Sequence, residues 1–575
     1  MPRVFSAASE KSFLSALLLT AALTGLGGAT EADAAPEAPA KQLEDQEGEK
    51  EDPRPPSPKA EYVTVKSSTT ADGTTGHTPG GGLMPHQTAP RAQSGLTRDF
   101  IAHQSPTQSP VALIASLPGV MYAESDPLGT KCDKQGFSVR LLDKSEIGYL
   151  FEGVHAAPPL FLMPYTSATA DPENIRAITL TQGSSEATAP LYNAVGGQLS
   201  VQMAQPKQKA GGFANLSYGS YALNREFLRL DSGEIGHSGI TSFASFSYRN
   251  AAQWRGAGDS PRYHVDSRLS KSWGKGSKTS LIFSYNWQRQ FYLRAPTKTQ
   301  WQAQGTHFNY TSHYTDGDTA YYLLQENARA QTFVAAPTEL RLTEHLHLAL
   351  NPYFIYVTGY DGFGTTLDPN TSYQGNQPAG PLQGGTVGKN GLITAVATDT
   401  YKQAHSGITA TLRWETGRNT LSAGAWYSYY DFSNPSRYAA VNAQGGATNM
   451  QGHQPILTQS GQPLTSYNSH LVQQVNALFV QERFRALSNR LTLSAAFRAI
   501  MVTRTVSNAL PGARYRNGAS YFSPQPQVAA SYAISPHDQI FINGTTGFRA
   551  PSGISNYNDR FSISTGKQTR SATAD

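Results

Sequence analysis

The sequence predicts a mostly β chain, in which a small N-terminal α/β domain is followed by a large antiparallel β-barrel that spans a membrane. Three observations support this fold class. Only 15% of the residues are charged, whereas 52 are glycine and 29 are tyrosine, which favours strands and turns over helices. Beyond residue 211 apolar and polar residues alternate with a period of two. Short and long connections between these segments also alternate, as they do in membrane barrels.

The composition also limits the class of membrane protein. The mean hydropathy of −0.42 argues against helical spans in the body of the chain. A barrel wall is compatible with this value, because only every second residue of a strand faces lipid. The net charge of +5 is small for 575 residues and gives no support for nucleic-acid binding.

Residues 1–34 have the pattern of a secretory signal peptide. Arg3 and Lys11 accompany a short apolar run at 13–29, and Ala32-Asp33-Ala34 fits a cleavage site. The run is short for a membrane anchor and contains several glycines, so we expect export. The single cysteine, Cys132, excludes an intramolecular disulfide and is interpreted as an unpaired thiol.

Residues 35–94 are expected to form a flexible arm. The stretch up to about residue 59 is acidic and rich in proline, and the stretch after residue 65 is rich in Thr, Gly and Pro. Between them lies a β-prone segment made of Glu61, Tyr62, Val63, Thr64 and Val65. A strand-forming segment between two flexible stretches suits pairing with the sheet edge of a partner protein. Chance clustering of Thr and Val is the alternative.

Residues 95–205 have the mixed pattern and the size of a small globular domain. A short helix is expected over 109–117, ending at Pro118-Gly119. Strands are expected within residues 137–142, 173–180 and 195–201.

Residues 211–575 carry the barrel pattern. The alternation is clearest in 281–288, 420–429 and 491–498. Tight turns are expected at residues 274–277, 343–345, 416–419, 487–490 and 535–538, and long connections at about 290–330, 358–404 and 431–470. This order places all tight turns at one rim of the barrel and all long loops at the other.

We count about 13 strands in this region. Aromatic residues near strand ends suit the interfacial girdles of a barrel: Tyr285, Trp287, Tyr427 and Tyr429. An odd number of strands leaves the last strand end on the long-loop side, and an open sheet edge in lipid has unpaired backbone groups. We therefore expect this chain to lack the end of its barrel.

Short motifs along the chain resemble those of the TonB-dependent outer-membrane receptor family. Plug-like motifs lie at residues 116–120 (SLPGV), 137–140, 146–154, 171–184 and 192–201 (YNAVGGQLSV), the last being the most specific. Barrel-like motifs lie at residues 478–482 (LFVQE), 523–524 and 547–552 (GFRAPS). The resemblance implies a plug domain over 95–205 inside a transmembrane barrel of about 22 strands, of which about 13 are visible here.

The resemblance also implies roles for particular residues. Residues 61–65 look like the TonB box, which pairs with the energy-transducing complex of the inner membrane. In the family, plug arginines pair with barrel glutamates, so Arg140 and Glu482 are the expected plug–barrel lock. Two positions depart from the family pattern: Leu141 replaces a glycine, and Gln182 replaces an arginine. One of the expected cations is therefore missing.

The implied function is active uptake across the outer membrane of a Gram-negative cell, with the plug and the arm facing the periplasm. The expected partners are the TonB energy-transducing complex, outer-membrane lipid and a small extracellular ligand, by default a ferric siderophore or similar metal chelate. Candidate ligand-contact residues are aromatic residues of the plug and the long loops: Tyr122, Phe161, Tyr165, Tyr314, Tyr360 and Phe363. For each of them, loop packing or a place in the aromatic girdle is the alternative.

Two other functional classes remain open. A passive porin or a surface adhesin would share the barrel but not the plug motifs at 116–201. A truncated, non-functional receptor would share every motif and fail to insert stably. The sequence has no Ser/His/Asp constellation, phosphate-binding loop or metal-ligand spacing, so we expect neither an enzyme nor a cofactor. His345 and His347 share a strand face, but they lie beside a turn and are not expected to bind metal.

Overall fold

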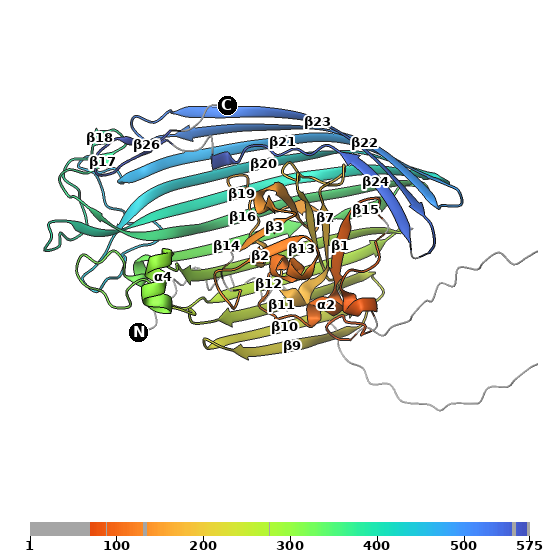
Figure 1. Cartoon of the computed structure of the whole chain (residues 1–575), viewed down its shortest axis with the longest axis horizontal. Coiled ribbons are helices and arrows are strands. Elements are labelled where there is room, and N and C mark those ends of the chain that lie inside the picture. Colours follow the sequence, from red (N-terminus) through yellow and green to blue (C-terminus); the bar gives the residue numbers. More distant parts are fainter. Residues whose placement is uncertain are drawn as a thin grey trace, which may run out of the picture. The chain divides into compact units, whose positions relative to one another are not determined.

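The computed structural model describes residues 70–571, with residues 77, 88, 130, 132–134, 275, 537 and 555–558 left out. The described residues belong to one compact unit, Thr69–Asp575 (Figure 1). The predicted signal peptide, the segment 61–65 and Cys132 lie outside the described residues. None of the described helices is long and apolar enough to cross a membrane.

Residues 93–203 form a small α/β region, called the plug below. Its main sheet has the strand order β1-β7-β8-β5-β6, and a second sheet has the order β2-β3-β4. Strands β5 and β8 are parallel, whereas the other pairs of the main sheet are antiparallel. The strands are β1 (Gln93–Thr97), β2 (Val120–Ala123), β3 (Gly136–Val139), β4 (Leu142–Asp143), β5 (Ile147–Phe151), β6 (Val154–His155), β7 (Ile175–Gln182) and β8 (Gly197–Met203).

The helices are short. They are α2 (Arg98–Ala102), α3 (Pro110–Leu113) and α4 (Lys298–Gln304), with 3₁₀ turns η1 (Pro79–Gly82), η2 (Ile114–Ser116), η3 (Lys144–Glu146), η4 (Thr166–Ala168), η5 (Pro172–Asn174), η6 (Gly305–His307) and η7 (Tyr322–Leu324). The predicted helix over 109–117 consists of α3 and η2. Ser109 caps α3 by accepting a hydrogen bond from the backbone N–H of Ala112 at 3.3 Å, and Pro110 suits the first turn.

The second part of the chain forms one large antiparallel sheet, called the wall below. Thirteen described strands follow one another in sequence order from β9 to β24, and β15 continues β14 between the same two neighbours. The predicted mostly β fold and the count of about 13 strands are confirmed. The strands are β9 (Ala210–Gly219), β10 (Leu223–Glu234), β11 (Ile240–Asn250), β12 (Arg262–Trp273), β13 (Ser277–Phe291), β14 (Glu326–Ala335), β15 (Thr338–Arg341), β16 (Leu346–Leu367), β19 (Ile393–Thr416), β20 (Asn419–Ala440), β21 (Thr465–Ala486), β22 (Leu491–Asn508), β23 (Arg516–Ala533) and β24 (Gln539–Thr545).

The connections of the wall follow the predicted alternation. The five predicted tight turns lie at one rim, called the short-turn rim, and the connections 292–325, 368–392 and 441–464 lie at the other, the long-loop rim. Two small hairpins lie outside the wall: β17 (Tyr373–Gln374) with β18 (Gln377–Pro378), and β25 (Arg560–Phe561) with β26 (Gln568–Arg570).

The predicted long connections were too long. The pairing of β16 with β19 continues to Leu367 and Ile393, well inside the connection expected at 358–404. Likewise β20 continues to Ala440 and β21 begins at Thr465. Near the long-loop rim polar residues and glycines occupy both faces of the strands, so the sequence loses its alternation although the backbone stays paired.

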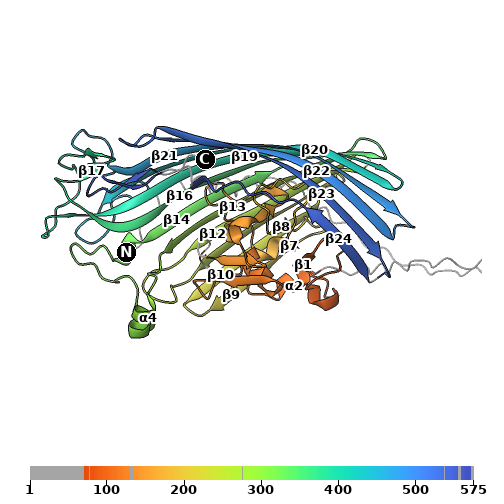
Figure 2. The ribbon, with the colours of Figure 1, turned by 45° about the horizontal axis from the view of Figure 1, so that its top comes forward.

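The plug lies against one side of the wall, which we call the inner face (Figures 1 and 2). Alternate residues of the wall strands point to this face. Asp266 on β12, Ser284 on β13 and Asn351 on β16 each form a hydrogen bond with the plug. Hydrogen bonds between plug and wall involve strands β10, β11, β12, β13, β14, β16, β21 and β22. The residues between the inner-face positions form the outer face. The plug therefore contacts one side of the wall across most of its width.

The outer face carries an apolar band. Its exposed side chains between the two rims include Phe354, Tyr356, Ile408, Leu412, Tyr427, Leu478 and Val480. On β19 the band ends near Trp414, beside the short-turn rim, and near Lys402, nine residues from the long-loop rim; these two residues are twelve positions apart. Twelve residues span about 40 Å of strand, or about 30 Å along the membrane normal for a strand tilted by about 40°. This height matches the hydrocarbon core of a bilayer.

Candidate functional site

The plug is joined to the wall by a buried cluster of charged residues. The plug turn that begins at Asp171 also contains Glu173, and both carboxylates lie against arginines of the inner face. Asp171 Oδ1 lies 2.6 Å from Arg262 Nη1 and 3.3 Å from Arg225 Nη2. Arg225 Nη1 also lies 2.6 Å from Glu173 Oε1. All four side chains are almost fully excluded from solvent, so each charge depends on its partners.

Further polar contacts extend this cluster along the wall. Asn174 Nδ2 donates hydrogen bonds to Ser245 Oγ at 2.7 Å and to Asp266 Oδ2 at 2.8 Å. Arg268 Nη1 donates to Glu152 Oε2 at 3.1 Å. Neighbouring wall strands thus bind neighbouring parts of the plug, and the plug is held at several points rather than at one.

The charge state of Asp171 follows from its surroundings. Burial alone would raise the pKa of its carboxyl group. Arg262, His264 and Arg225 outweigh burial and hold the pKa of Asp171 well below its usual value. The Asp171 carboxylate is therefore ionised, and the two guanidinium groups balance the charges of Asp171 and Glu173 together.

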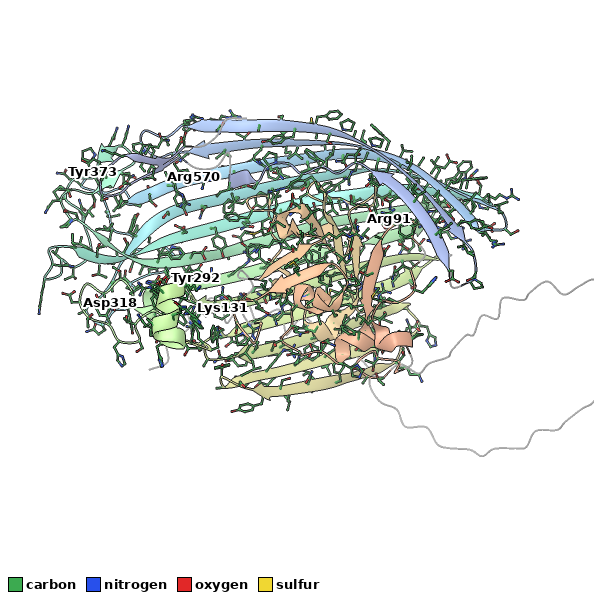
Figure 3. The ribbon with its side chains drawn as sticks, in the orientation of Figure 1. Arg91, Lys131, Tyr292, Asp318, Tyr373 and Arg570 are labelled. Carbon is green, nitrogen blue, oxygen red and sulfur yellow. The ribbon has the colours of Figure 1, made fainter. Side chains whose placement is uncertain are left out.

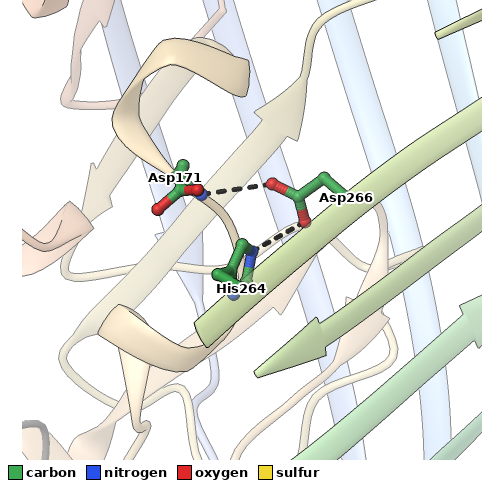
Figure 4. Close-up of side chains that lie close together, drawn as sticks. All are labelled: Asp171, His264 and Asp266. Carbon is green, nitrogen blue, oxygen red and sulfur yellow. Dashed lines mark hydrogen bonds and ion pairs between the residues drawn. The ribbon is translucent and has the colours of Figure 1, made fainter. Parts of the chain in front are cut away.

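Asp171, His264 and Asp266 form a group that could hold a metal ion, since their ligand atoms lie within 4.8 Å of one another (Figure 4). Within the group, His264 Nε2 lies 2.8 Å from Asp266 Oδ1, and the backbone N–H of Asp171 donates to Asp266 Oδ2 at 3.2 Å. The two arginines beside Asp171 would repel a divalent cation placed here. We therefore assign the group to the plug–wall contact and not to a metal site.

The structure does not join Arg140 to Glu482, the pair expected to lock the plug. Arg140 Nε donates to Gln182 Oε1 at 2.8 Å within the plug. Glu482 lies an odd number of positions from Gln473, an inner-face residue of the same strand, so Glu482 is on the outer face and exposed. The charges of the observed contact are reversed relative to the expectation, with carboxylates on the plug and arginines on the wall.

A second plug–wall contact is a buried aromatic cluster. His155 and Tyr192 of the plug have ring centroids 4.9 Å apart. Tyr192 stacks on Trp426 of the wall at 6.2 Å, and the His155 ring lies 6.4 Å from that of His405. Gln473 Nε2 donates to Tyr192 OH at 3.0 Å. This contact excludes water at a point on the wall far along the sheet order from the charged cluster.

We expect His155 to make the protein less stable in mild acid. Burial lowers the pKa of His155 to about 4, and the nearby Asn193 side chain opposes the shift only in part. In the unfolded chain the pKa is about 6.5, so the unfolded state binds the proton first as the pH falls. The free energy of unfolding is then highest above pH 6.5 and falls by about 3 kcal/mol between pH 6.5 and 4.

Urea unfolding of the wild type and of His155→Phe, each at pH 7.5 and pH 4.5, measures this contribution. The variant is expected to lose part of the pH dependence. An equal fall in unfolding free energy for both proteins would assign the effect to other groups.

Aromatic and charged side chains also gather on the inner face near the long-loop rim. We define the mouth patch as Tyr165, Tyr292, Arg329, Asp361 and Phe363. The Arg329 guanidinium lies 3.8 Å from the ring centroid of Tyr165, a plug residue. The rings of Tyr292 and Phe363 stack at 5.0 Å, and the Tyr292 hydroxyl donates to Asp361.

The plug contributes a cation beside this patch. Lys131 is buried, and its Nζ donates to the backbone carbonyl of Phe291, the residue before Tyr292 (Figure 3). Lys131 and Arg329 thus bring positive charge to the mouth from the plug and from the wall. Cations beside stacked aromatic rings suit an anionic ligand with apolar parts.

The mouth patch contains two of the predicted ligand-contact residues, Tyr165 and Phe363. Phe161 is exposed in the plug loop that leads to Tyr165. Tyr122 is instead packed against the plug core, and its hydroxyl donates to Glu124. Burial and this carboxylate raise the pKa of Tyr122.

The other two predicted residues lie away from the mouth patch. Tyr314 packs on Tyr321 within a long loop, with ring centroids 5.5 Å apart. Tyr360 is paired with Ala328 and points to the outer face, where its hydroxyl donates to Glu326. Sequence alternation could have excluded Tyr360, since it differs by an odd number of positions from Phe363 on the same strand.

The arginines of the charged cluster were missed by the sequence reasoning. A signal is present in residues 262–268 (RYHVDSR), where the alternate positions 262, 264, 266 and 268 are all charged or titratable. All four are buried on the inner face. A row of charges with a period of two, in a strand whose other face is apolar, indicates a buried polar partner.

Solved structures that are similar to this chain include transporters and receptors for iron chelates. The chain is similar to the ferric citrate transporter FecA in its unliganded form, with a TM-score of 0.60 and 13% identity over 80% of this chain and 63% of that chain. It is also similar to the siderophore receptor PiuA from Acinetobacter baumannii, with a TM-score of 0.57 and 11% identity over 80% and 64%. For the ferric-catecholate import receptor Fiu from E. coli K12 in its open form, the TM-score is 0.56 and the identity 13% over 81% and 70%.

These similarities show the plug-and-barrel fold of the TonB-dependent outer-membrane receptors. The chain spans less than two thirds of the length of FecA and PiuA. No protein-family model matches the sequence, and no curated protein is significantly similar to it.

Proposed function

We propose that this protein is an outer-membrane receptor that takes up a ferric siderophore or a similar metal chelate with energy from the inner-membrane TonB complex. The observation that carries the proposal is the plug held against the inner face of the wall by buried ion pairs. A passive porin is disfavoured, because the plug occupies the space on the inner face of the wall and solutes could cross only after the plug moves. The iron-chelate receptors among the solved structures of this fold support the choice of ligand.

The energy is proposed to enter through residues 61–65, which resemble a TonB box. The chain leads from this segment towards β1, an edge strand of the plug sheet. Among the described strands β1 pairs with β7, and on its other side a single bridge joins Leu96 to Leu83. An edge strand can be detached without breaking the rest of its sheet. A pull on the arm would therefore open the plug from β1 while the charged cluster still holds the turn at Asp171.

The mouth patch is proposed to bind the ligand. Replacing Arg329 with Gln or Phe363 with Ala is expected to weaken chelate binding by about tenfold each, because each change removes a charge-assisted or a stacking contact. Fluorescence quenching of the purified protein by ferric citrate, a ferric catecholate, a ferric hydroxamate and cobalamin measures binding. Tyr515→Ala, an exposed aromatic between β22 and β23, is the control and should bind like the wild type. Equal losses in all three variants would place the ligand elsewhere.

The second candidate is a receptor fragment without transport function. In the described sheet order β9 and β24 are the two ends and do not pair with each other. Edge strands in lipid leave backbone N–H and C=O groups unpaired, so transport requires both edges to be covered. Heat-modifiable electrophoresis of outer membranes distinguishes the candidates. A folded, protease-resistant band for the 575-residue chain supports the receptor, and a fully denatured band supports the fragment.

A further inference from the structure

A groove of about 480 Å³ opens on the outer face of the wall, on the side opposite the plug, and the segment 328–330 of β14 lines part of it. The pairing register of the strands shows that the groove lies on the outer face. Trp287 pairs with Ala330, Ala330 with Thr358, and Thr358 with Lys402, which forms one row across β13, β14, β16 and β19. These residues alternate with inner-face positions that contact the plug, such as Arg329. The groove is therefore reached from outside the barrel.

The row from Trp287 to Lys402 lies at the end of the apolar band that is nearer the long-loop rim. On β13, Trp287 is four residues from the strand end that leads into the connection 292–325. Its ring lies 5.6 Å from that of Tyr263, which in turn lies 5.0 Å from Tyr248, so three aromatic rings mark this level on the outer face. Aromatic rows of this kind lie at the boundary between hydrocarbon and headgroups. The groove is thus at headgroup height in the outer leaflet.

The polar lining of the groove is mainly cationic. Lys402 projects from β19 and is exposed. Arg437 Nη1 donates to the Gly452 carbonyl at 2.9 Å, while its Nε is buried and has no hydrogen-bond partner among the described residues. The loop 441–464 adds His453, and Trp287 and Tyr360 add aromatic surface.

Two carboxylates near the groove on this face each have a partner. Glu326 accepts the hydrogen bond of the Tyr360 hydroxyl, and Asp431 is paired with His470 at 3.0 Å. No carboxylate side chain lines the groove among the described residues. Lys402 and Arg437 therefore leave it with a positive charge.

We propose that this groove binds the phosphorylated headgroup of an anionic lipid of the outer leaflet. Lys402 supplies a point charge, and Arg437 supplies a second cation with planar N–H donors, a combination that suits a phosphate monoester. The aromatic side chains contact the first part of the acyl chains. The assignment rests on the membrane location in the proposed function, but not on the identity of the imported ligand.

The test uses the full chain purified in a zwitterionic detergent and titrated with phosphatidic acid, whose headgroup is a phosphate monoester. Native mass spectrometry counts the bound lipids, with phosphatidylcholine as the reference lipid and inorganic phosphate as a soluble competitor. The wild type is expected to retain phosphatidic acid about tenfold more strongly than phosphatidylcholine, and Lys402→Gln and Arg437→Gln are each expected to lose most of that preference.

Lys271→Gln is the matched control, because Lys271 is an exposed wall lysine next to the short-turn rim and outside the groove. It should retain the lipid like the wild type. Since Arg437 also holds the loop at Gly452, Lys402→Gln gives the cleaner result if Arg437→Gln perturbs folding.

Equal lipid retention by the wild type and Lys402→Gln would overturn the proposal. Binding of inorganic phosphate without a preference for phosphatidic acid would also overturn it, since the groove would then be a site for soluble anions. If the proposed uptake function is wrong, the result differs: the protein binds no chelate, but it retains phosphatidic acid as before.

Discussion

Replacing Asp171 with Ala is expected to lower the free energy of unfolding by about 3–5 kcal/mol and to loosen the plug. The change removes the carboxylate that pairs with Arg262 at 2.6 Å and with Arg225 at 3.3 Å. Arg225 keeps Glu173, but Arg262 has no other ion pair among the described residues. Its guanidinium would remain buried without a counter-charge, which costs far more than the loss of an exposed pair.

Urea unfolding of the purified protein measures the change in stability. Entry of a large hydrophilic antibiotic into cells that produce the variant measures how far the plug has opened. Glu415→Ala is the matched control, because Glu415 pairs with Arg413 at 2.9 Å while both side chains are about half exposed. That control is expected to cost less than about 1 kcal/mol. Adding Arg262→Met to Asp171→Ala should restore part of the stability. If Asp171→Ala is no more harmful than Glu415→Ala, the charged cluster does not hold the plug.

Replacing Gly197 with Ala is expected to destabilise the plug by about 3 kcal/mol. Gly197 begins β8 with φ of 132°, and a Cβ atom there would lie 2.1 Å from the carbonyl oxygen of Thr181 on β7. The clash is with backbone, so β7 and β8 would have to separate. Because β8 pairs with both β5 and β7, the whole plug sheet would be disturbed.

Gly211→Ala is the control for this substitution. Gly211 lies in β9, has no positive φ, and an added Cβ would meet nothing within 4 Å. Its replacement is expected to change stability by less than about 0.5 kcal/mol. Thermal unfolding of both variants measures the difference. Equal melting temperatures would contradict the close approach of β7 and β8.

The strands of the wall could be predicted from sequence wherever one face meets lipid. Residues 281–288 alternate because Leu281 and Trp287 lie on the outer face while Asn286 lies on the inner face. The parts of β16 and β19 next to the long-loop rim could not be predicted, because glycine and polar residues occupy both faces there. Their pairing depends on backbone hydrogen bonds between distant segments, which leave little trace in local sequence.

The candidate site was less predictable than the fold. The sequence predicts Tyr165 and Phe363 as ligand contacts because they are aromatic, and both lie in the mouth patch, but nothing in the sequence indicates that Arg329 lies over Tyr165. The plug–wall contact joins Asp171 to Arg262, which are 91 residues apart. Family motifs suggested Arg140 and Glu482 instead, and strand parity shows why Glu482 points away from the plug.

The most direct test of the receptor function is accumulation of a radiolabelled ferric chelate by cells that produce this protein and lack other receptors for that chelate. The chelate is the one that binds most tightly to the purified protein. The proposed function predicts energy-dependent accumulation. Deletion of residues 61–65 should leave surface binding in the cold unchanged and abolish accumulation, as should an uncoupler of the inner membrane. Accumulation that persists in both cases, or no saturable binding of any chelate, would contradict the proposed function.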